Sequence, residues 1–129
     1  MTNSSRCVLV VDDDAIRLMV ERVLQRENIE VECARDGFEA IEKLASRDYG
    51  AILLDLMMPR VDGVGVLRYL ERSRPDDAPP VILMTANVEG AEEAASLSPV
   101  VALLAKPFDI QQMVRQVRRS AEASSSSSN

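Results

Sequence analysis

Residues 51–63 read AILLDLMMPRVDG, an apolar run that is broken by a carboxylate at Asp55. Four consecutive apolar residues at 51–54 are typical of a strand that is buried on both faces, as the strands of parallel sheets are. The Pro and the Asp-Gly pair in the second half of the stretch are typical of a loop. The stretch therefore predicts a buried strand that ends in an acidic side chain, followed by an irregular connection.

Four further apolar runs have the same character, and amphipathic segments alternate with them. The additional strands are predicted at Cys7–Val11, Ile29–Ala34, Val81–Met84 and Val100–Leu104. Helix-like periodicity follows each strand, and it is weakest over 88–97, which contains Gly90. Five strand–helix units in strict alternation predict an α/β fold in which helices cover both faces of an open parallel sheet.

The apolar positions of the helices predict which sides pack on the sheet. The expected stripes are Ile16, Met19, Val20, Val23 and Leu24 in the first helix, Phe38, Ile41, Leu44 and Ala45 in the second, Val66, Leu67 and Leu70 in the third, and Ile110, Met113, Val114 and Val117 in the last. The last helix is predicted to begin at Asp109, because an aspartate side chain can cap it.

The composition is that of one globular domain. The chain has 129 residues, of which 47% are hydrophobic and 28% charged, and its formal net charge is −6. The negative charge argues against a nucleic-acid partner, whose phosphates would be repelled. No apolar run approaches the ~20 residues of a membrane span, and the polar N-terminus lacks the apolar stretch of a signal peptide. We therefore expect a cytoplasmic domain over 7–121, between a polar tail at 1–6 and a disordered Ser-rich tail at 122–129.

The chain contains no histidine, which excludes a Ser-His-Asp triad, a His-ligated zinc ion and an internal phosphohistidine. Acid, base or metal chemistry must therefore use carboxylates, hydroxyls, lysine and backbone groups. The two cysteines, Cys7 and Cys33, fit neither a disulfide framework nor a paired zinc motif. We expect both thiols to stay reduced, because their offset on neighbouring strands separates them by more than the ~7 Å that a disulfide allows.

Polar side chains follow four of the five predicted strands at the point where each strand ends. They are Asp12-Asp13, Asp55, Thr85 and Lys106. The carboxyl ends of parallel strands meet at one edge of the sheet, where ligands bind in open α/β folds. Each residue by itself is explained as a turn former or a helix cap, but that explanation weakens when all of them are expected at one edge.

Together these residues indicate a phosphoryl-transfer site. Two carboxylates about 5 Å apart repel by about 3 kcal/mol at an effective dielectric constant of ~20, so a cluster of them needs a cation or a changed protonation state. Oxygen ligands without histidine or cysteine favour Mg²⁺. Lys106 supplies a positive charge for a phosphoryl oxygen, and Thr85 supplies a hydroxyl donor.

Five stretches in this order and spacing resemble the receiver domain of response regulators in two-component signalling, namely VLVVDDD, DGFEAIEKL, ILLDLMMPRVDG, VILMTA and LLAKPF. The resemblance implies a doubly wound, flavodoxin-like sheet of order 2-1-3-4-5. It also implies a signalling switch and not an enzyme, with no chemistry beyond its own phosphorylation and dephosphorylation. The chain would be a stand-alone receiver or the receiver part of a longer regulator.

The resemblance assigns roles to the residues at the strand ends. Asp55 would accept a phosphoryl group from a sensor histidine kinase or a phosphotransfer protein, and the phosphorylated domain would signal by protein–protein contact. Mg²⁺ would be bound by Asp12, Asp13, Asp55 and the backbone carbonyl of Met57. The phosphoryl group would contact Thr85, Ala86 and Lys106, and the peptide bond between Lys106 and Pro107 would be cis.

One position departs from the family pattern. Receiver domains usually carry an aromatic residue three positions before the matching lysine, and this residue moves with the threonine on activation. Here that position is Leu103. We therefore expect a conventional phosphorylation site and an unconventional switch between Thr85 and Leu103.

Other functions fit part of the pattern. Asp12 and Asp14 after an apolar strand resemble the first motif of haloacid-dehalogenase-type phosphatases, in which Asp12 would be the nucleophile, but Asp55 then has no role. A receiver fold that mediates protein interactions and is never phosphorylated is a second alternative, for which Leu103 leaves room. A flavin-binding fold of similar topology is disfavoured by the acidic loops and by an aromatic content of 3%.

Overall fold

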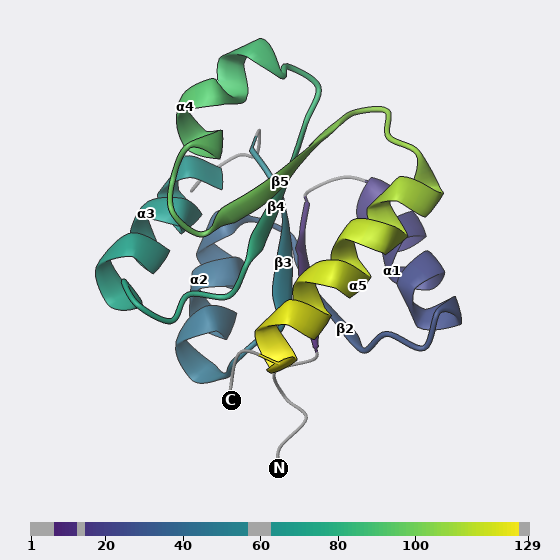
Figure 1. Cartoon of the computed structure of the whole chain (residues 1–129), viewed down its shortest axis with the longest axis horizontal. Helices are drawn as coiled ribbons and strands as arrows, with labels where there is room; N and C mark the ends of the chain where they lie inside the picture. The colour runs from purple at the N-terminus through teal and green to yellow at the C-terminus, as the bar shows by residue number, and fades with distance from the viewer. Residues whose placement is uncertain (1–6, 13–14, 57–62, 127–129) are drawn as a thin grey trace.

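The fold is seen in a computed structural model, which describes residues 7–12, 15–56 and 63–126, with side chains described as far as 121. Strands and helices alternate along the chain as predicted (Figure 1). The strands are β1 (Val8–Val11), β2 (Val31–Ala34), β3 (Ala51–Asp55), β4 (Val81–Thr85) and β5 (Val100–Ala105). The helices are α1 (Ile16–Arg26), α2 (Gly37–Ser46), α3 (Gly63–Ser73), α4 (Glu92–Ala95) and α5 (Ile110–Ser126), and a 3₁₀ helix (Glu89–Ala91) precedes α4.

The five strands form one parallel sheet in the order β2-β1-β3-β4-β5, which confirms the predicted doubly wound topology. Strands β1, β3 and β4 are buried along their whole length, as expected for strands covered on both faces. The register aligns their carboxyl ends, because Val11 lies opposite Leu54 and Asp55 lies opposite Met84. The residues that follow these strands are therefore brought together at one edge.

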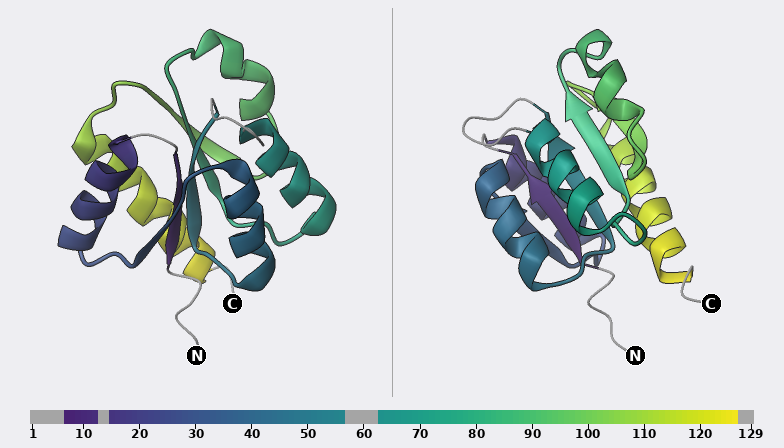
Figure 2. Two further views of the ribbon diagram at one scale, coloured as in Figure 1. Left: turned by 180° about the vertical axis from the view of Figure 1, so that it is seen from behind. Right: turned by 90° about the vertical axis from the view of Figure 1, so that its left-hand side faces the viewer.

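Helices α1 and α5 cover one face of the sheet, and α2, α3 and α4 cover the other (Figure 2). Alternate strand residues point into the two layers. Leu9 and Ile52 pack with the α2–α4 side, whereas Val10 and Leu53 pack with the α1–α5 side. Full burial of each large apolar side chain contributes about 1.5–3 kcal/mol, so β1, β3 and β4 are firmly held in the core.

The side of α2 that packs on the sheet differs from the prediction by one residue. Phe38 and Ala45 are exposed, whereas Ala40 and Leu44 are buried. The helix start explains the difference, because the Asp36 side chain accepts a hydrogen bond from the backbone N–H three residues on, at 2.8 Å. This cap fixes the first turn and with it the side that meets the sheet. The predicted and the observed buried positions of α2 are both spaced three to four residues apart, so hydrophobic periodicity alone did not distinguish them.

Residues 88–97, for which the sequence predicts only a weak helix, form little regular helix. This segment forms the 3₁₀ helix and the four-residue α4, and its buried residues are the small Ala91 and Ala94. In Figure 1 this green segment stands at the top of the molecule beside α3. Small side chains bury little apolar area, so this part of the chain is held to the core less strongly than its neighbours.

Helix α5 begins where the sequence predicts. The Asp109 side chain accepts a hydrogen bond from the Gln111 N–H at 2.8 Å, which is the expected cap. The backbone is helical as far as Ser126, while the domain boundary at 121 and the disorder of the Ser-rich tail stay predictions. Within the described residues, no helix is both long enough and apolar enough to cross a membrane.

Both cysteines are free, as the sequence predicts. Cys33 lies opposite Val10, three residues along the first strand from Cys7. Burial raises the pKa of the Cys7 thiol to about 11 although Arg47 acts in the opposite direction. Burial, helped by the nearby Glu21 carboxylate, raises the pKa of the Cys33 thiol to about 11 as well. Both thiols are therefore protonated at neutral pH and poor nucleophiles.

We expect two thiols to titrate in denaturant without reductant, and both to react slowly with a thiol reagent in the folded protein at pH 8. Because the pKa of each is raised in the folded state, the neutral thiols favour folding below pH 9, and this contribution is lost as the pH rises from 9 to about 11. Reaction rates measured against pH test this. Fast modification of folded protein at pH 8, or purified monomer without titratable thiols, would contradict it.

Candidate functional site

The predicted polar positions lie at the carboxyl ends of β1, β3, β4 and β5. Backbone hydrogen bonds of the sheet continue to these positions: the Asp12 N–H donates to the Ala34 carbonyl at 3.1 Å, and the Lys106 N–H donates to the Thr85 carbonyl at 2.8 Å. Next to Asp55, the Leu56 N–H donates to the Met84 carbonyl at 3.1 Å. The sheet therefore fixes the backbone of each polar residue, which holds a site more rigidly than loops would.

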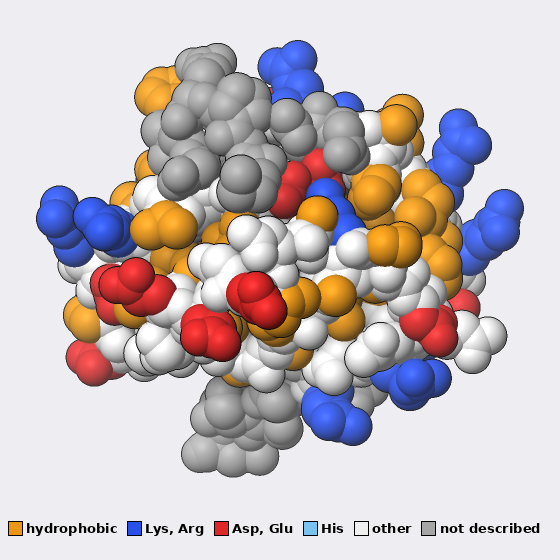
Figure 3. Space-filling model, turned by 90° about the horizontal axis from the view of Figure 1, so that it is seen from above, with side chains coloured by type: hydrophobic (Ala, Val, Ile, Leu, Met, Phe, Trp, Pro, Cys, Tyr) orange, Lys and Arg blue, Asp and Glu red, His pale blue; other side chains and the backbone are white. Residues whose placement is uncertain are grey.

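The Lys106 side chain connects the acidic residues at this edge. Its Nζ lies 3.1 Å from Asp12 Oδ2, within hydrogen-bond distance, and 3.4 Å from Asp55 Oδ2. Figure 3 looks down on this edge and shows red acidic and blue basic side chains side by side near the middle of the face. Residues separated by about 50 positions along the chain are thus combined into one charged cluster.

The cluster is buried, so its charges interact strongly. The Asp12 side chain has no exposed surface, the Asp55 side chain is 5% exposed and that of Lys106 is 14% exposed. Removing an ion from water costs several kcal/mol unless a partner offsets the loss. Two carboxylates share one ammonium group here, and the trio keeps a net negative charge that favours a further cation.

The donor atoms suit a hard divalent cation. In the described residues no three acidic, histidine or cysteine side chains gather at one point, and the site contains the two carboxylates of Asp12 and Asp55. The other predicted ligands, Asp13 and the Met57 carbonyl, lie outside the described residues. Carboxylate oxygens fit Mg²⁺, which commonly binds through one or two carboxylates and keeps several waters.

Thr85 lies at its predicted place, with its hydroxyl engaged by the following loop. Its side chain is buried at the end of β4, and Oγ1 accepts a hydrogen bond from the Asn87 N–H at 3.0 Å. The same hydroxyl faces the Asn87 carbonyl oxygen at 3.4 Å. Ala86, between them, is exposed. The Thr85 hydroxyl is therefore held by the backbone of the loop that follows β4, and contacts of Thr85 and Ala86 with a phosphoryl group stay a prediction.

Two residues that the sequence analysis did not identify support the site. Arg17 donates a hydrogen bond from Nη1 to the Asp12 carbonyl at 3.0 Å, which holds the end of β1. At Gly63 a Cβ atom would lie 2.7 Å from the Leu56 Cα and 2.8 Å from the Asp55 carbonyl oxygen, so only glycine fits beside β3. The Asp-Gly pair was a signal for Gly63, whereas Arg17 occupies an ordinary position in the first turn of a helix.

The sequence makes two predictions near Lys106, one about its peptide bond with Pro107 and one about Leu103. The Lys106–Pro107 peptide bond is cis, as predicted. Leu103, the position where the family usually has an aromatic residue, is half-buried opposite Leu83 of β4. It packs against the apolar cluster on the α2–α4 side of the sheet. Its side chain is thus directed inward.

Relatives of known family share this sequence pattern. A family model described as "Response regulator receiver domain" matches residues 8–118. Response regulator MprA of Mycobacterium ulcerans is 42% identical over 113 residues, which are 86% of this chain and 48% of that protein. MprA of Mycobacterium avium is 41% identical, over 86% of this chain and 49% of that protein. The chain spans about half the length of these relatives.

Solved structures share the fold. The receiver domain of Francisella response regulator 1452 superposes with a TM-score of 0.82 at 30% identity, covering 92% of this chain and 98% of that one. Vibrio cholerae CheY4 gives 0.78 at 29% identity, covering 88% and 97%. Thermotoga maritima TrrA, solved with Mg²⁺-BeF, gives 0.78 at 28% identity, covering 89% and 98%. With these matches and the arrangement of its strand ends, the chain belongs to the response regulator receiver domain family.

Proposed function

We propose that this receiver domain is a signalling switch in which Asp55 accepts a phosphoryl group in a Mg²⁺-dependent reaction. The observation that carries the proposal is the placement of Lys106, whose ammonium lies 3.1 Å from Asp12 and 3.4 Å from Asp55. A positive charge beside the Asp55 carboxylate can contact the oxygens of an incoming phosphoryl group, and a bound cation would offset the remaining negative charge of the two carboxylates. The solved TrrA structure, which contains Mg²⁺-BeF, supports the same assignment by similarity.

Each residue contributes to the transfer by position or by charge. The Asp55 carboxylate is the nucleophile, and attack on an activated phosphoryl donor requires mainly alignment and charge neutralisation. Lys106 neutralises charge on the phosphoryl oxygens, and the Thr85 hydroxyl and the Ala86 N–H donate hydrogen bonds to them. Asp12, Asp13, Asp55 and the Met57 carbonyl would hold Mg²⁺. The bound ion supplies positive charge that offsets the repulsion between the carboxylate and the incoming phosphoryl group.

The phosphoryl donor lies outside these 129 residues. They contain no histidine, so we expect the donor to be the phosphohistidine of a sensor histidine kinase or a phosphotransfer protein in the cytoplasm. The phosphorylated domain then acts on a downstream protein by direct contact. No chemistry beyond phosphorylation and dephosphorylation of Asp55 is needed for this role.

The direct test is incubation with Mg²⁺ and acetyl phosphate, followed by mass spectrometry of the intact protein and of its peptides. The proposal expects one added phosphoryl group, on Asp55, that depends on Mg²⁺. Phosphorylation of Asp12 would instead support a haloacid-dehalogenase-type phosphatase. Protein that takes up no phosphate from acetyl phosphate or from a panel of phosphorylated kinases would support a receiver fold used only for binding.

Leu103 leads to a prediction about which parts of the domain change conformation when Asp55 is phosphorylated. A tyrosine or tryptophan has a polar group that can favour an outward position, but a leucine does not. Burial of leucine is favourable by ~1.5–3 kcal/mol whether or not Asp55 is phosphorylated. A phosphoryl group shifts an equilibrium only by its different interaction with the two states. We therefore expect residues 100–118 to change little on activation.

NMR spectra of the metal-free and the beryllofluoride-activated protein test this expectation, since beryllofluoride with Mg²⁺ mimics a phosphoryl group. Shift changes should be largest around Asp55 and in 88–97, and small over 100–118. Cooperative changes across 100–118 as large as those around Asp55 would show that Leu103 switches without an aromatic ring.

A further inference from the structure

A cleft of about 540 Å³ lies between α3 and the segment 89–97, which forms the 3₁₀ helix and α4. On the same face of the sheet α2 and α3 pack against each other, so the cleft is an opening in the helical layer. Three of its lining residues, Val64, Ala94 and Leu97, pack on the apolar cluster beneath and keep part of their surface exposed. An occupant that covered them would gain the free energy of apolar burial.

The lining residues repeat at helical spacing on both walls of the cleft. They are Val64, Arg68 and Arg72 on α3, and Gly90, Ala94 and Leu97 on the other wall. Three positions at intervals of four residues cover about 12 Å of helix, at 1.5 Å per residue. The cleft is therefore elongated, and its two walls run along helical segments. This shape suits a further helix laid between them better than it suits a compact molecule.

Two arginines on the α3 wall can bind an anionic group. Arg68 and Arg72 are exposed, and within residues 7–12, 15–56 and 63–121 neither of them forms an ion pair. Arg74, by contrast, pairs with Asp48 at 2.7 Å. Like charges four residues apart slightly destabilise a helix, so the stability of α3 does not explain the two arginines. Carboxylates of a bound partner would give both guanidinium groups a counter-charge.

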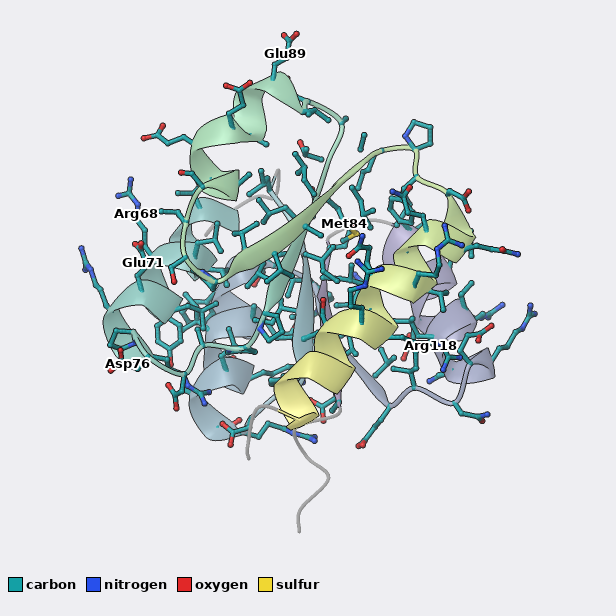
Figure 4. The ribbon with its side chains drawn as sticks, in the orientation of Figure 1. Arg68, Glu71, Asp76, Met84, Glu89 and Arg118 are labelled. Atoms are coloured by element: carbon teal, nitrogen blue, oxygen red, sulfur yellow. The ribbon has the colours of Figure 1, made fainter. Side chains whose placement is uncertain are left out.

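The two walls carry charges of opposite sign. Glu71 also lines the α3 wall and offsets one of the two arginine charges, so that wall stays positive. Glu93 lines the other wall, on the segment that carries the exposed Glu89 and Glu92 as well. Figure 4 shows Arg68 and Glu71 on α3, below the segment that carries Glu89. A partner must therefore present acidic side chains to one wall and basic side chains to the other.

We propose that this cleft is a docking site for an amphipathic helix of a partner protein, whose apolar stripe is flanked by acidic residues on one side and basic residues on the other. The stripe covers Val64 and Leu97, the acidic flank pairs with Arg68 and Arg72, and the basic flank pairs with Glu93. Opposite charges on the two walls fix the direction in which the helix lies, as flanking charges do in coiled coils. The cleft is open without a phosphoryl group, so the inference goes beyond the proposed function and does not depend on it.

Three synthetic peptides of one length and with the same leucine stripe serve as probes. The first has one acidic and one basic flank, the second has two acidic flanks, and the third has two basic flanks. The mixed peptide should bind about tenfold more tightly than either of the others, because each of those places like charges against one wall. Fluorescence anisotropy with the full chain gives the Kd values. NMR shift changes should gather at Val64, Arg68, Ala94 and Leu97.

Charge reversal on the α3 wall tests which residues set this preference. Arg68→Glu combined with Arg72→Glu makes both walls acidic, so the peptide with two basic flanks should become the tightest and the mixed peptide should lose about tenfold. Arg115→Glu combined with Arg119→Glu is the matched control. These arginines are also exposed and four residues apart, but they lie on α5, on the other face of the sheet (Figure 2). The control should keep the wild-type order of affinities.

Equal affinities of the three peptides, binding of none of them, or shift changes outside the cleft would overturn the inference. An unchanged preference after reversal of Arg68 and Arg72 would overturn it as well. If the cleft takes up small organic acids from a fragment screen but no peptide, its occupant is a small molecule and not a partner helix. None of these results bears on phosphorylation of Asp55, which the experiment with acetyl phosphate decides.

Discussion

Replacement of Asp55 by asparagine is expected to abolish Mg²⁺-dependent phosphorylation by acetyl phosphate, a loss on the order of 100-fold or more. An amide has nearly the shape of a carboxylate but lacks the negative oxygen that attacks phosphorus. The fold should persist, because the backbone next to residue 55 is held by the sheet through the Leu56 N–H and the Met84 carbonyl. Without metal the variant should be at least as stable as the wild type, since one of two buried carboxylates is neutralised.

The control for this variant is Asp76→Asn, because Asp76 is an exposed aspartate beyond the end of α3, far from the strand ends (Figure 4). It should be phosphorylated like the wild type. Mass spectrometry of the wild type and of the Asp55→Asn, Asp76→Asn and Asp12→Asn variants, with and without Mg²⁺, separates the cases. Labelling that survives in Asp55→Asn and disappears in Asp12→Asn would assign the nucleophile to Asp12 and reject the proposed function.

The position of the site could be predicted from the sequence because each of its residues interrupts a pattern. Asp12, Asp55, Thr85 and Lys106 each come directly after an apolar run, so the end of each strand was visible without knowledge of tertiary structure. The alternation of strands and helices placed those ends on one edge. The sequence could not provide the pairing itself, since a lysine that bridges Asp12 and Asp55 depends on the register of β5 against β4.

Features that depend on local backbone geometry escaped the sequence analysis. The exposure of Phe38 follows from the phase of α2, which a single hydrogen bond to Asp36 fixes. Asn87 and Gly90 are common residues for a loop, and no pattern of letters shows that one caps the other. Such features rotate a helix by about one residue or change one side-chain rotamer. Hydrophobic periodicity does not resolve differences this small.

Replacement of Lys106 by methionine is expected to lower the metal-free free energy of unfolding by about 3 kcal/mol. Methionine keeps most of the apolar stem of lysine, so the packing loss is small, whereas Asp12 and Asp55 lose the ammonium group that lies 3.1 Å and 3.4 Å away. Two buried carboxylates then lose the ammonium group that they share. Mg²⁺ should restore more stability to this variant than to the wild type, because the ion binds the folded state and replaces the missing charge.

Urea unfolding in EDTA and in Mg²⁺ measures these effects, and Lys43→Met is a matched control. Lys43 is the other lysine of the chain, and its contact with Glu32 is a half-exposed pair at 3.9 Å, so its loss should cost less than about 1 kcal/mol. Adding Asp55→Asn to Lys106→Met should recover part of the lost stability, and more than Asp55→Asn adds to the wild type, because the two sites interact directly. If Asp55→Asn has the same effect in both backgrounds, Lys106 is not the counter-charge of Asp55, and the ammonium between the carboxylates would no longer support phosphoryl transfer at this site.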